Sequence, residues 1–152
     1  MSRFVLNNTV TMAWCFTEEA TEFTKALLSR LSNLTDTAVV PALWLDEVVN
    51  VVELAVRKGR IPGEKALAFL ESLGDLPIEV ENPSRTQVFV AVRRLAGQFQ
   101  LTGYDAAYLE PANRHKLPIA SLDKALSRAA VAAGISSGMT TARLVRSGVA
   151  RR

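Results

Sequence analysis

Two acidic residues in the C-terminal half of the sequence stand at positions where a site could form. Asp105 opens an apolar, helix-like segment at residues 101–110, and Asp123 comes just after a short strand-like segment at residues 118–120. Acids at the end of a strand or at the start of a helix lie at the rim of an α/β sheet, where ligand sites form. These two positions therefore predict part of an acidic pocket.

Two further polar residues have comparable positions nearer the N-terminus. Asn7 follows the first apolar segment of the chain, and Glu47 lies in a helix-like segment after the second. Glu47 is one helical turn from Leu43 and one turn from Val51, on the side that faces the expected core. A carboxylate on that side needs a partner or a cation, because the burial of an isolated charge is costly.

We expect four side chains to converge at the C-terminal edge of one sheet: Asn7, Glu47, Asp105 and Asp123. Carboxylates that meet at one point repel one another and require a counter-charge. Oxygen ligands with few nitrogen or sulfur ligands beside them favour Mg²⁺ or Mn²⁺. Such ions lower the pKa of a bound water and stabilise the charge that develops when a phosphodiester is cut. The predicted chemistry is therefore metal-assisted cleavage of a phosphodiester.

Simpler roles exist for the same residues. Asp123 precedes a helical pattern and could be its N-cap, and Asp105 in a first helical turn could interact with the helix dipole. Thr102 likewise has the position of a helix cap. The spacing of these residues does not by itself decide between capping and metal binding. His115, the only histidine, has no evident serine or cysteine partner, which argues against a role as general base.

The elements that would hold these residues alternate between strands and helices. The strand-like segments are residues 4–6, 38–40, 77–80 and 118–120. The helix-like segments are residues 18–31, 42–58, 63–73, 85–98, one that begins after Thr102, and one from Asp123 to Ala133. This alternation predicts βαβ units. The expected fold is an α/β three-layer sandwich, in which a parallel sheet of four or five strands has helices on both faces.

Some local predictions follow from the same patterns. Residues 7–9 are predicted to be a turn, because asparagine and threonine break the first strand. Thr17, followed by two glutamates, is predicted to be the N-cap of the first helix. The helix at residues 85–98 is predicted to start after Ser84 and to bury Val88, Val92, Leu95 and Phe99.

Composition describes one globular domain with a basic tail. The chain has 152 residues, of which 49% are hydrophobic and 22% charged, and none of its apolar runs approaches a membrane span. We expect no signal peptide, and the single cysteine, Cys15, is predicted to pack in the core of a cytoplasmic protein. The expected domain spans residues 1–135 and the flexible tail residues 136–152.

The tail carries the excess of positive charge. It contains Arg143, Arg146, Arg151 and Arg152 and no acidic residue. Without these four arginines, 14 basic residues stand against 15 acidic ones, so the domain itself has a net charge of −1. A basic tail can bind phosphates, and a solvated end is the alternative. Arg93 and Arg94 could contact an RNA backbone, although such pairs on helices are usually only solvated.

Several motifs together resemble the PIN domain, in particular the VapC-type toxins of bacterial toxin–antitoxin pairs. They are Phe-Val-Leu-Asn-Asn-Thr-Val at residues 4–10, Trp-x-x-Glu-Val-x-Asn-Val at residues 44–51, Leu-Thr-x-x-Asp-Ala-Ala-Tyr-Leu-Glu at residues 101–110 and Leu-Pro-Ile-Ala-Ser-Leu-Asp-Lys-Ala-Leu at residues 117–126. The resemblance covers residues 2–135 in the family's order, and the Tyr-Asp-Ala-Ala-Tyr segment is fairly specific. It implies a metal-dependent endoribonuclease that uses Mg²⁺ or Mn²⁺, acts on RNA and is silenced by a small antitoxin.

The resemblance also assigns roles to residues. The family's acidic metal positions correspond to Asn7, Glu47, Asp105 and Asp123, of which the last three would be catalytic, and its hydroxyl positions correspond to Thr9 and Thr102. The family has an aspartate where this chain has Asn7. Asparagine keeps one carbonyl oxygen but has no negative charge. We therefore expect weakened metal binding and impaired activity, and the alternative is a non-cleaving scaffold that binds antitoxin or RNA.

Partner predictions follow from the same resemblance. The apolar helices between Leu43 and Leu73 carry more hydrophobic residues than the sheet requires, and an antitoxin helix is expected to bind in a groove there. A homodimer is expected, and a membrane is not. The larger aromatic residues are predicted to be core or dimer contacts rather than platforms for RNA bases. They are Trp14, Trp44, Tyr104 and Tyr108.

Overall fold

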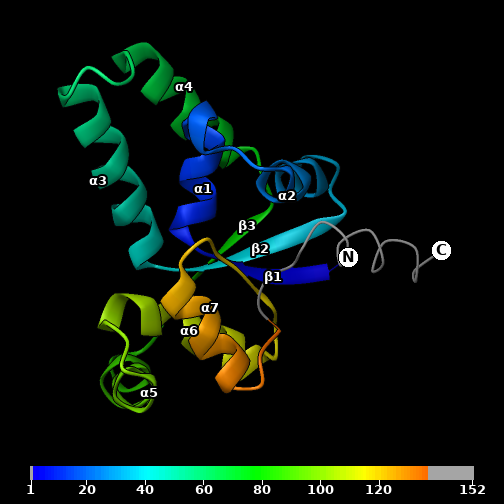
Figure 1. Ribbon diagram of the computed structural model, residues 1–152, viewed down its shortest axis with the longest axis vertical. Helices are drawn as coiled ribbons and strands as arrows, with labels where there is room; N and C mark the ends of the chain where they lie inside the picture. Colours follow the sequence, from blue (N-terminus) through cyan, green and yellow to red (C-terminus); the bar gives the residue numbers. More distant parts are fainter. Residues whose placement is uncertain (1, 137–152) are drawn as a thin grey trace.

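A parallel sheet forms the centre of the molecule. The computed structural model describes residues 2–136, and within them the strands are β1 (Ser2–Leu6), β2 (Asp36–Pro41), β3 (Ile78–Glu81) and β4 (Ile119–Ala120). They pair in the order β3-β2-β1-β4. Figure 1 labels the first three of these, β3, β2 and β1, in the middle of the molecule. Every residue of β2 is buried, as expected for a parallel sheet covered on both faces. The prediction of a parallel sheet with four or five strands is confirmed, with four.

The strand order places a topological switch point between β1 and β4. The first three strands follow one another across the sheet in one direction, whereas β4 pairs on the other side of β1. Leu6 is opposite Ala120, and the backbone N–H of Asn7 donates to the carbonyl of Ala120 at 3.0 Å. The carboxyl ends of β1 and β4 are therefore adjacent. In open α/β sheets ligands bind at this kind of position.

Helices cover both faces of the sheet, as Figure 1 shows. One layer contains α1 (Asn8–Cys15), a single 3₁₀ turn η1 (Thr17–Glu19), α2 (Glu22–Ser32), α3 (Leu43–Arg57) and α4 (Gly63–Gly74). The other contains η2 (Gln87–Val92), α5 (Arg93–Phe99), α6 (Gly103–His115) and α7 (Lys124–Ala132). The predicted three-layer sandwich is therefore confirmed. Helices α3 and α4 form a hairpin beside α1.

The core lies where α6 packs against β1 and β2. Phe4 and Leu6 from β1, Val39 from β2, and Tyr108 and Leu109 from α6 are fully or almost fully buried. Burial of a side chain of this size contributes about 1.5–3 kcal/mol each to folding. Because the same helix carries Asp105 at its first turn, this packing also fixes the position of that carboxylate.

Residues 7–9 do not form the predicted turn. Helix α1 begins at once after β1, and Asn7 is its N-cap, with an extended backbone at φ −79° and ψ 149°. Its side chain accepts a hydrogen bond from the backbone N–H of Thr9. Asparagine and threonine favour turns for the same reason that they favour caps, namely that their side chains bond to nearby backbone groups. The buried Val10 and Met12 then hold the helix against the core.

The predicted N-cap at Thr17 is wrong, and the cap is Thr21. Residues Thr17–Glu19 form only the 3₁₀ turn, and α2 starts after Thr21. The Thr21 hydroxyl accepts from the backbone N–H of Thr24 at 3.1 Å, while the Thr24 hydroxyl accepts from the backbone N–H of Thr21 at 2.9 Å. This reciprocal capping box satisfies two backbone donors. Thr17 and the two glutamates after it match the sequence pattern of an N-cap, but Thr17 lies inside the 3₁₀ turn, and the capping box forms between Thr21 and Thr24.

A π-helical stretch changes which side chains the helix after Ser84 buries. Ser84 starts the helix as predicted, since its hydroxyl accepts from the backbone N–H of Gln87 at 3.1 Å. Val92 and Leu95 are buried as predicted, but Val88 is 38% exposed. Residues Gln87–Val92 have the wider π-helical turn, which breaks the 3.6-residue periodicity on which the prediction depended.

The other helix boundaries agree closely with the sequence patterns. Gly59 (φ +71°) follows α3 and Gly134 (φ +78°) follows α7, where the left-handed conformation ends each helix at low steric cost. None of the helices within residues 2–136 is long and apolar enough to span a membrane. The predicted basic tail, apart from Ser136, lies outside the described residues.

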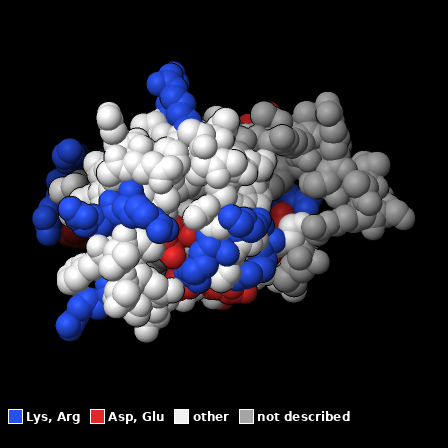
Figure 2. Space-filling view, turned by 90° about the horizontal axis from the view of Figure 1, so that it is seen from below, with Lys and Arg blue, Asp and Glu red and all other residues white. Residues whose placement is uncertain are grey.

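Charge is divided unevenly between the two halves of the fold. Residues 2–81, which include the α1–α4 layer, contain 7 lysines and arginines and 12 acidic residues. Residues 82–136, which include the α5–α7 layer, contain 7 basic and 3 acidic residues, a net charge of +4. Figure 2 views the molecule from the side of α5–α7 and shows lysine and arginine side chains gathered around a small acidic area.

Candidate functional site

Asn7 is a hydrogen-bonding centre at the switch point. Its Oδ1 accepts from the Thr9 hydroxyl at 2.6 Å, from the Ser121 hydroxyl at 3.0 Å and from the backbone N–H of Thr9 at 3.3 Å. The side chain is buried, with 4% of the residue exposed. Since the backbone N–H can only donate, it fixes which arm of the amide is the oxygen. The other arm of the side chain is therefore the NH₂ group.

The same hydroxyls connect the start of α1 to the turn between β4 and α7. The Thr9 hydroxyl oxygen accepts from the backbone N–H of Leu122 at 2.9 Å. The Ser121 hydroxyl oxygen accepts from the backbone N–H of Asp123 at 2.9 Å. Asn7 and Asp123 are thus held by one chain of hydrogen bonds, although 115 positions separate Asn7 from Leu122 in the sequence. This arrangement fixes the loop that carries Asp123.

Asp123 is the N-cap of α7. Its Oδ1 accepts from the backbone N–H of Leu126 at 3.0 Å, so the simpler role suggested by the sequence is real. One carboxylate oxygen serves the cap, and the second has no hydrogen bond from residues 2–136. Capping and ligand binding are therefore compatible in this residue.

Asp105 lies in the first turn of α6, where none of the residues 2–136 compensates its charge. The Thr102 hydroxyl caps the helix by accepting from the backbone N–H of Asp105 at 3.1 Å. The Asp105 carboxylate is half-buried, and burial together with the negative charge of Asp123 raises its pKa. Neither a hydrogen bond nor a cation from the described residues opposes this increase. Such a carboxylate is stabilised by a bound cation.

Glu47 faces the core from α3, as the sequence predicted, and its partner is Tyr108. The Tyr108 hydroxyl donates to Glu47 Oε1 at 2.5 Å. Burial raises the pKa of the Glu47 carboxyl, the hydrogen bond from Tyr108 lowers it, and the charge of Asp105 raises it again, so the pKa is above its usual value. Tyr108 is 1% exposed, and burial and the nearby Glu47 raise the pKa of its phenol.

The three carboxylates therefore interact electrostatically in a row, in the order Glu47, Asp105, Asp123. Asp105 acts on Glu47 and Asp123 acts on Asp105, and in each case the interaction raises the pKa. The described residues contain no group of three or more acidic, histidine or cysteine side chains that lie close enough together to hold a metal ion. The available donors are nevertheless all oxygens, which is the chemistry that Mg²⁺ and Mn²⁺ prefer. A cation would remove the repulsion within the row.

Other side chains considered from the sequence have structural partners. The Thr9 and Thr102 hydroxyls are predicted as supporting groups. The Thr9 hydroxyl donates to Asn7 Oδ1, and the Thr102 hydroxyl caps α6. His115 contacts Glu81 at 2.7 Å. It comes ten residues after Asp105 on α6, so the two residues are about 15 Å apart along the helix. Trp44 donates to the Thr11 hydroxyl at 3.0 Å inside the core, as the core prediction requires.

Sequence reasoning missed the roles of two residues at the site. Tyr108 lies in the core, as predicted, but the sequence does not predict its hydrogen bond to Glu47, and it predicts no role for Ser121. Tyr108 is three residues after Asp105 and so shares its helix face, which is a signal available in the sequence. Ser121 follows β4 directly and precedes Asp123 by two residues, a spacing typical of hydroxyls that bond to the backbone of a turn.

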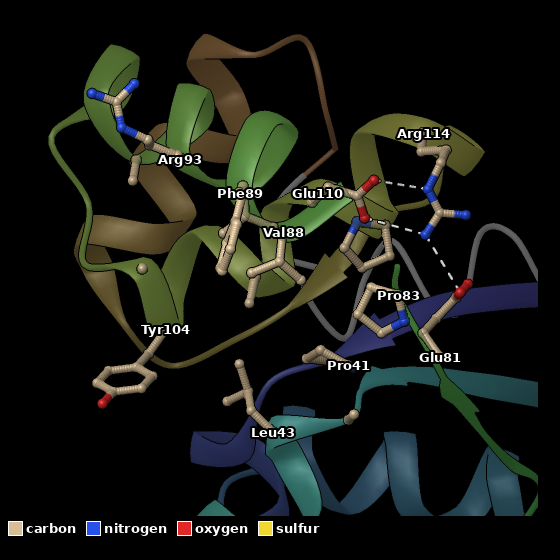
Figure 3. A pocket seen from close by; sticks show the side chains of 16 residues that line it. Pro41, Leu43, Glu81, Pro83, Val88, Phe89, Arg93, Tyr104, Glu110 and Arg114 are labelled. Carbon is tan, nitrogen blue, oxygen red and sulfur yellow. Dashed lines mark hydrogen bonds and ion pairs between the residues drawn. The ribbon is translucent and has the colours of Figure 1, made fainter. Parts of the chain in front are cut away.

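A large apolar groove reaches the first turn of α6, the turn that also carries Asp105. Its volume is about 740 Å³, and Figure 3 shows that it is bordered by η2, the start of α6 and the start of α3. Phe89 and Tyr104 line it and are 68% and 69% exposed. At its far end Arg114 pairs with the buried Glu110 and with Glu81.

Solved structures of similar fold extend over nearly the whole chain. "PAE2754 from Pyrobaculum aerophilum" has a TM-score of 0.69 and 18% identity over 95% of this chain and 94% of that one. VapBC2 from Rickettsia felis, bound to a DNA fragment from their promoter, has a TM-score of 0.62 and 13% identity over 89% and 96%. FitAcB from Neisseria gonorrhoeae has a TM-score of 0.60 and 17% identity over 88% and 95%.

These likenesses establish the fold, and a comparison with curated protein sequences finds no match. The PIN domain family matches residues 5–132. That range contains all four positions that the sequence resemblance assigned to the metal site. Because it also covers most of the chain and agrees with the sheet order and helix layers described above, the chain belongs to the PIN domain family.

Proposed function

We propose that the protein is a metal-dependent endoribonuclease of the VapC toxin type whose activity is reduced by Asn7. PIN domains are generally nucleases, and the chain belongs to that family. The observation that carries the proposal is the row formed by Glu47, Asp105 and Asp123. In this row burial, and after it the charge of a neighbouring acid, raises the pKa of Glu47 and of Asp105, and no cation among the described residues opposes the increase. A site with this electrostatic character is suited to a divalent cation.

The residues have separate roles in the proposed reaction. Asp105 and the free oxygen of Asp123 supply ligand atoms, and Tyr108 holds Glu47 so that its second oxygen is available. A bound Mg²⁺ or Mn²⁺ supplies a water of lowered pKa and stabilises the charge that develops on the phosphate. The hydrogen bonds of the Thr9 and Ser121 hydroxyls keep the loop before Asp123 in place.

The hydrogen bonds of Asn7 support the proposal that this residue reduces activity. Its only oxygen already accepts three hydrogen bonds, and the remaining arm is an NH₂ group, which donates and does not bind cations. An aspartate in the same position would keep the three bonds with one oxygen and offer the second as a charged ligand. Asn7 therefore removes one ligand and one negative charge while it preserves the surrounding structure.

This explanation predicts that Asn7→Asp increases metal affinity and RNA cleavage. Mn²⁺ should bind about 10–100-fold more tightly to the variant, the range typical for loss or gain of one supporting interaction at a metal site. The measurement is calorimetric titration with Mn²⁺, followed by cleavage of a labelled RNA. Asn7→Asp combined with Asp105→Asn is the matched control and should lose the gain. Equal affinity and cleavage in the parent chain and in Asn7→Asp would refute the explanation.

The second candidate function is a non-cleaving scaffold. The three hydrogen bonds that occupy Asn7 Oδ1 favour it, because they leave the site with one ligand fewer than the family pattern. In that case neither the parent chain nor Asn7→Asp binds Mn²⁺, whereas the chain still binds RNA or an antitoxin. The metal titration therefore separates the two candidates.

An antitoxin is the proposed protein partner. A hollow of about 310 Å³ lies between α3, α4 and β3, and the neighbouring surface exposes Leu45, Val49 and Leu67. An amphipathic helix can cover such a surface with its apolar face. The resemblance to VapC-type toxins supports this choice of partner. A homodimer and a cytoplasmic location remain predictions from the same resemblance.

A further inference from the structure

Most basic side chains of the α5–α7 layer have no acidic partner within the described residues. Of its three acidic residues, Asp105 and Asp123 belong to the candidate metal site, and the buried Glu110 is paired with Arg114 at 2.8 Å. Six other basic residues in residues 82–136 are exposed and form no ion pair with the described residues: Arg85, Arg93, Arg94, Lys116, Lys124 and Arg128. This face is therefore suited to an anionic polymer.

Two exposed aromatic rings lie next to this charge. Tyr104 immediately precedes Asp105, and its exposed ring lies at the edge of the groove and points away from Phe89 (Figure 3). Arg93, on α5, lines the same groove. Aromatic rings stack on nucleic-acid bases only where the bases are unpaired and splayed out. The combination of rings and free cations is typical of surfaces that bind single strands.

We propose that single-stranded RNA binds across this face, with a base stacked on Tyr104 and phosphates held by Arg93 and Arg94. The proposal rests on the proposed nuclease function and names the surface by which the substrate reaches the carboxylates. Phe89 and the apolar groove receive the neighbouring base. Arg93 and Arg94 also both line a second hollow at α5.

A second copy of the chain is the competing occupant of the groove. The charged residues that line the groove are balanced, with Arg93 and Arg114 against Glu81 and Glu110. Two copies that meet there would nevertheless bring together two segments 82–136, each with a net charge of +4. Juxtaposition of like charges disfavours such an interface. An RNA strand has the opposite charge and supplies flat apolar bases for the groove. The charge distribution therefore favours RNA over a second copy.

The test is binding of a fluorescently labelled ten-nucleotide single-stranded RNA to the full chain, with EDTA present so that cleavage does not interfere. Affinity is measured at several salt concentrations by fluorescence anisotropy. Removal of each phosphate contact should reduce the slope of log K against log salt by about 0.7 for a single strand. We expect the double variant Arg93→Gln, Arg94→Gln to have a slope smaller by about 1.4. The pair Lys25→Gln, Lys65→Gln, on exposed positions of α2 and α4, is the matched control and should leave the slope unchanged.

Tyr104 tests the stacking part of the proposal. Tyr104→Ala should weaken binding by about 5- to 100-fold with an unchanged salt slope, because a stacked base is lost but a phosphate contact is not. Tyr104→Phe keeps the ring and should bind as the parent chain does. A double-stranded RNA of the same sequence should bind more weakly and should not distinguish Tyr104→Ala from the parent chain.

Two results would overturn the proposal. One is an unchanged salt slope in the arginine double variant. The other is a change from dimer to monomer in light scattering for Phe89→Asp while RNA affinity stays the same, which would assign the groove to a second copy. Because binding is measured without metal, a failed Mn²⁺ titration would refute the nuclease function and leave this surface standing, so the two failures can be told apart.

Discussion

Tyr108 is a buried residue that orients a carboxylate of the candidate site without being a proposed metal ligand itself. Its hydroxyl donates to Glu47 Oε1 at 2.5 Å, and its ring belongs to the core between α6 and the sheet. Glutamate has several rotamers, and a hydrogen bond from a fixed donor selects one of them. Supporting partners of this kind orient metal ligands and are often as important as some of the ligands.

We therefore expect Tyr108→Phe to reduce metal affinity while the protein remains folded. The variant keeps the buried ring but removes the donor to Glu47, so Mn²⁺ should bind about tenfold less tightly when both chains also carry Asn7→Asp. Calorimetric titration measures the difference, and circular dichroism checks the fold. Tyr104→Phe, which removes an exposed hydroxyl instead, is the control. Equal Mn²⁺ affinity with and without the Tyr108 hydroxyl would show that Glu47 needs no such support.

At the scale of elements, an ion-pair cluster ties β3 to α6. Glu81 at the end of β3 contacts His115 at 2.7 Å and Arg114 at 3.4 Å, while Arg114 also holds the buried Glu110 at 2.8 Å. Burial alone would raise the pKa of Glu81, but the bonds from His115 and Arg114 bring it below its usual value. The cluster thus fixes the far end of the helix whose first turn carries Asp105.

This cluster predicts a pH-dependent effect of Glu81→Gln. A carboxyl with a lowered pKa in the folded state stabilises the protein above its ordinary pKa, and the contribution is lost as the pH falls through the folded value. At pH 7 the variant should lose about 1 kcal/mol, or roughly 2–4 °C in melting temperature. The difference should shrink toward about pH 3.5. Thermal denaturation at both pH values measures it.

The control for that experiment is Glu79→Gln on the same strand. Glu79 pairs with Arg3 at the surface, where both side chains are well exposed, and such pairs contribute little. A loss of stability that is the same at neutral and acid pH, or the same in the two variants, would contradict the role given to the cluster.

At the scale of the whole molecule, the fold tolerates repulsion at its site. Asp105 and Glu47 have pKa values raised by burial and by the neighbouring acids, so their ionised forms make the metal-free protein less stable at neutral pH. Carboxyls with perturbed pKa values are enriched at functional sites. The rest of the fold, with α6 packed against two buried strands, compensates for this cost.

The metal-free Asp105→Asn variant should therefore be more stable than the parent chain. For an acid whose folded pKa is raised, stability falls as the pH rises from the ordinary value to the folded value, and the full cost remains above it. At pH 8 with EDTA we expect a melting temperature higher by about 1–3 °C. The advantage should disappear as the pH approaches about 4. The control is Asp46→Asn, at an exposed position of α3, which should change the melting temperature little at either pH. If the parent chain is as stable as Asp105→Asn at pH 8, the carboxylates do not destabilise the fold.

Local patterns predicted most elements but not all of their details. The apolar runs and glycines located the four strands and the ends of α3 and α7. The patterns did not distinguish Thr21 from Thr17 as a cap, because the deciding partner, the Thr24 hydroxyl, is specified by packing of α2. They also did not reveal the π-helical stretch that exposes Val88 and Phe89. That stretch forms part of the groove.

The sequence by itself determined the kinds of side chain available to the site, the helix or strand on which each lies, and the neutral residue at position 7. These features depend on spacings of a few residues, which short-range sterics and hydrogen bonds convert into local structure. Only the tertiary structure decided which of them meet. The pairing of β4 beside β1 brings Ser121 to Asn7, and the packing of α6 brings Tyr108 to Glu47. Contacts between residues 61 and 114 positions apart depend on the order of strands in the sheet, which local patterns do not encode.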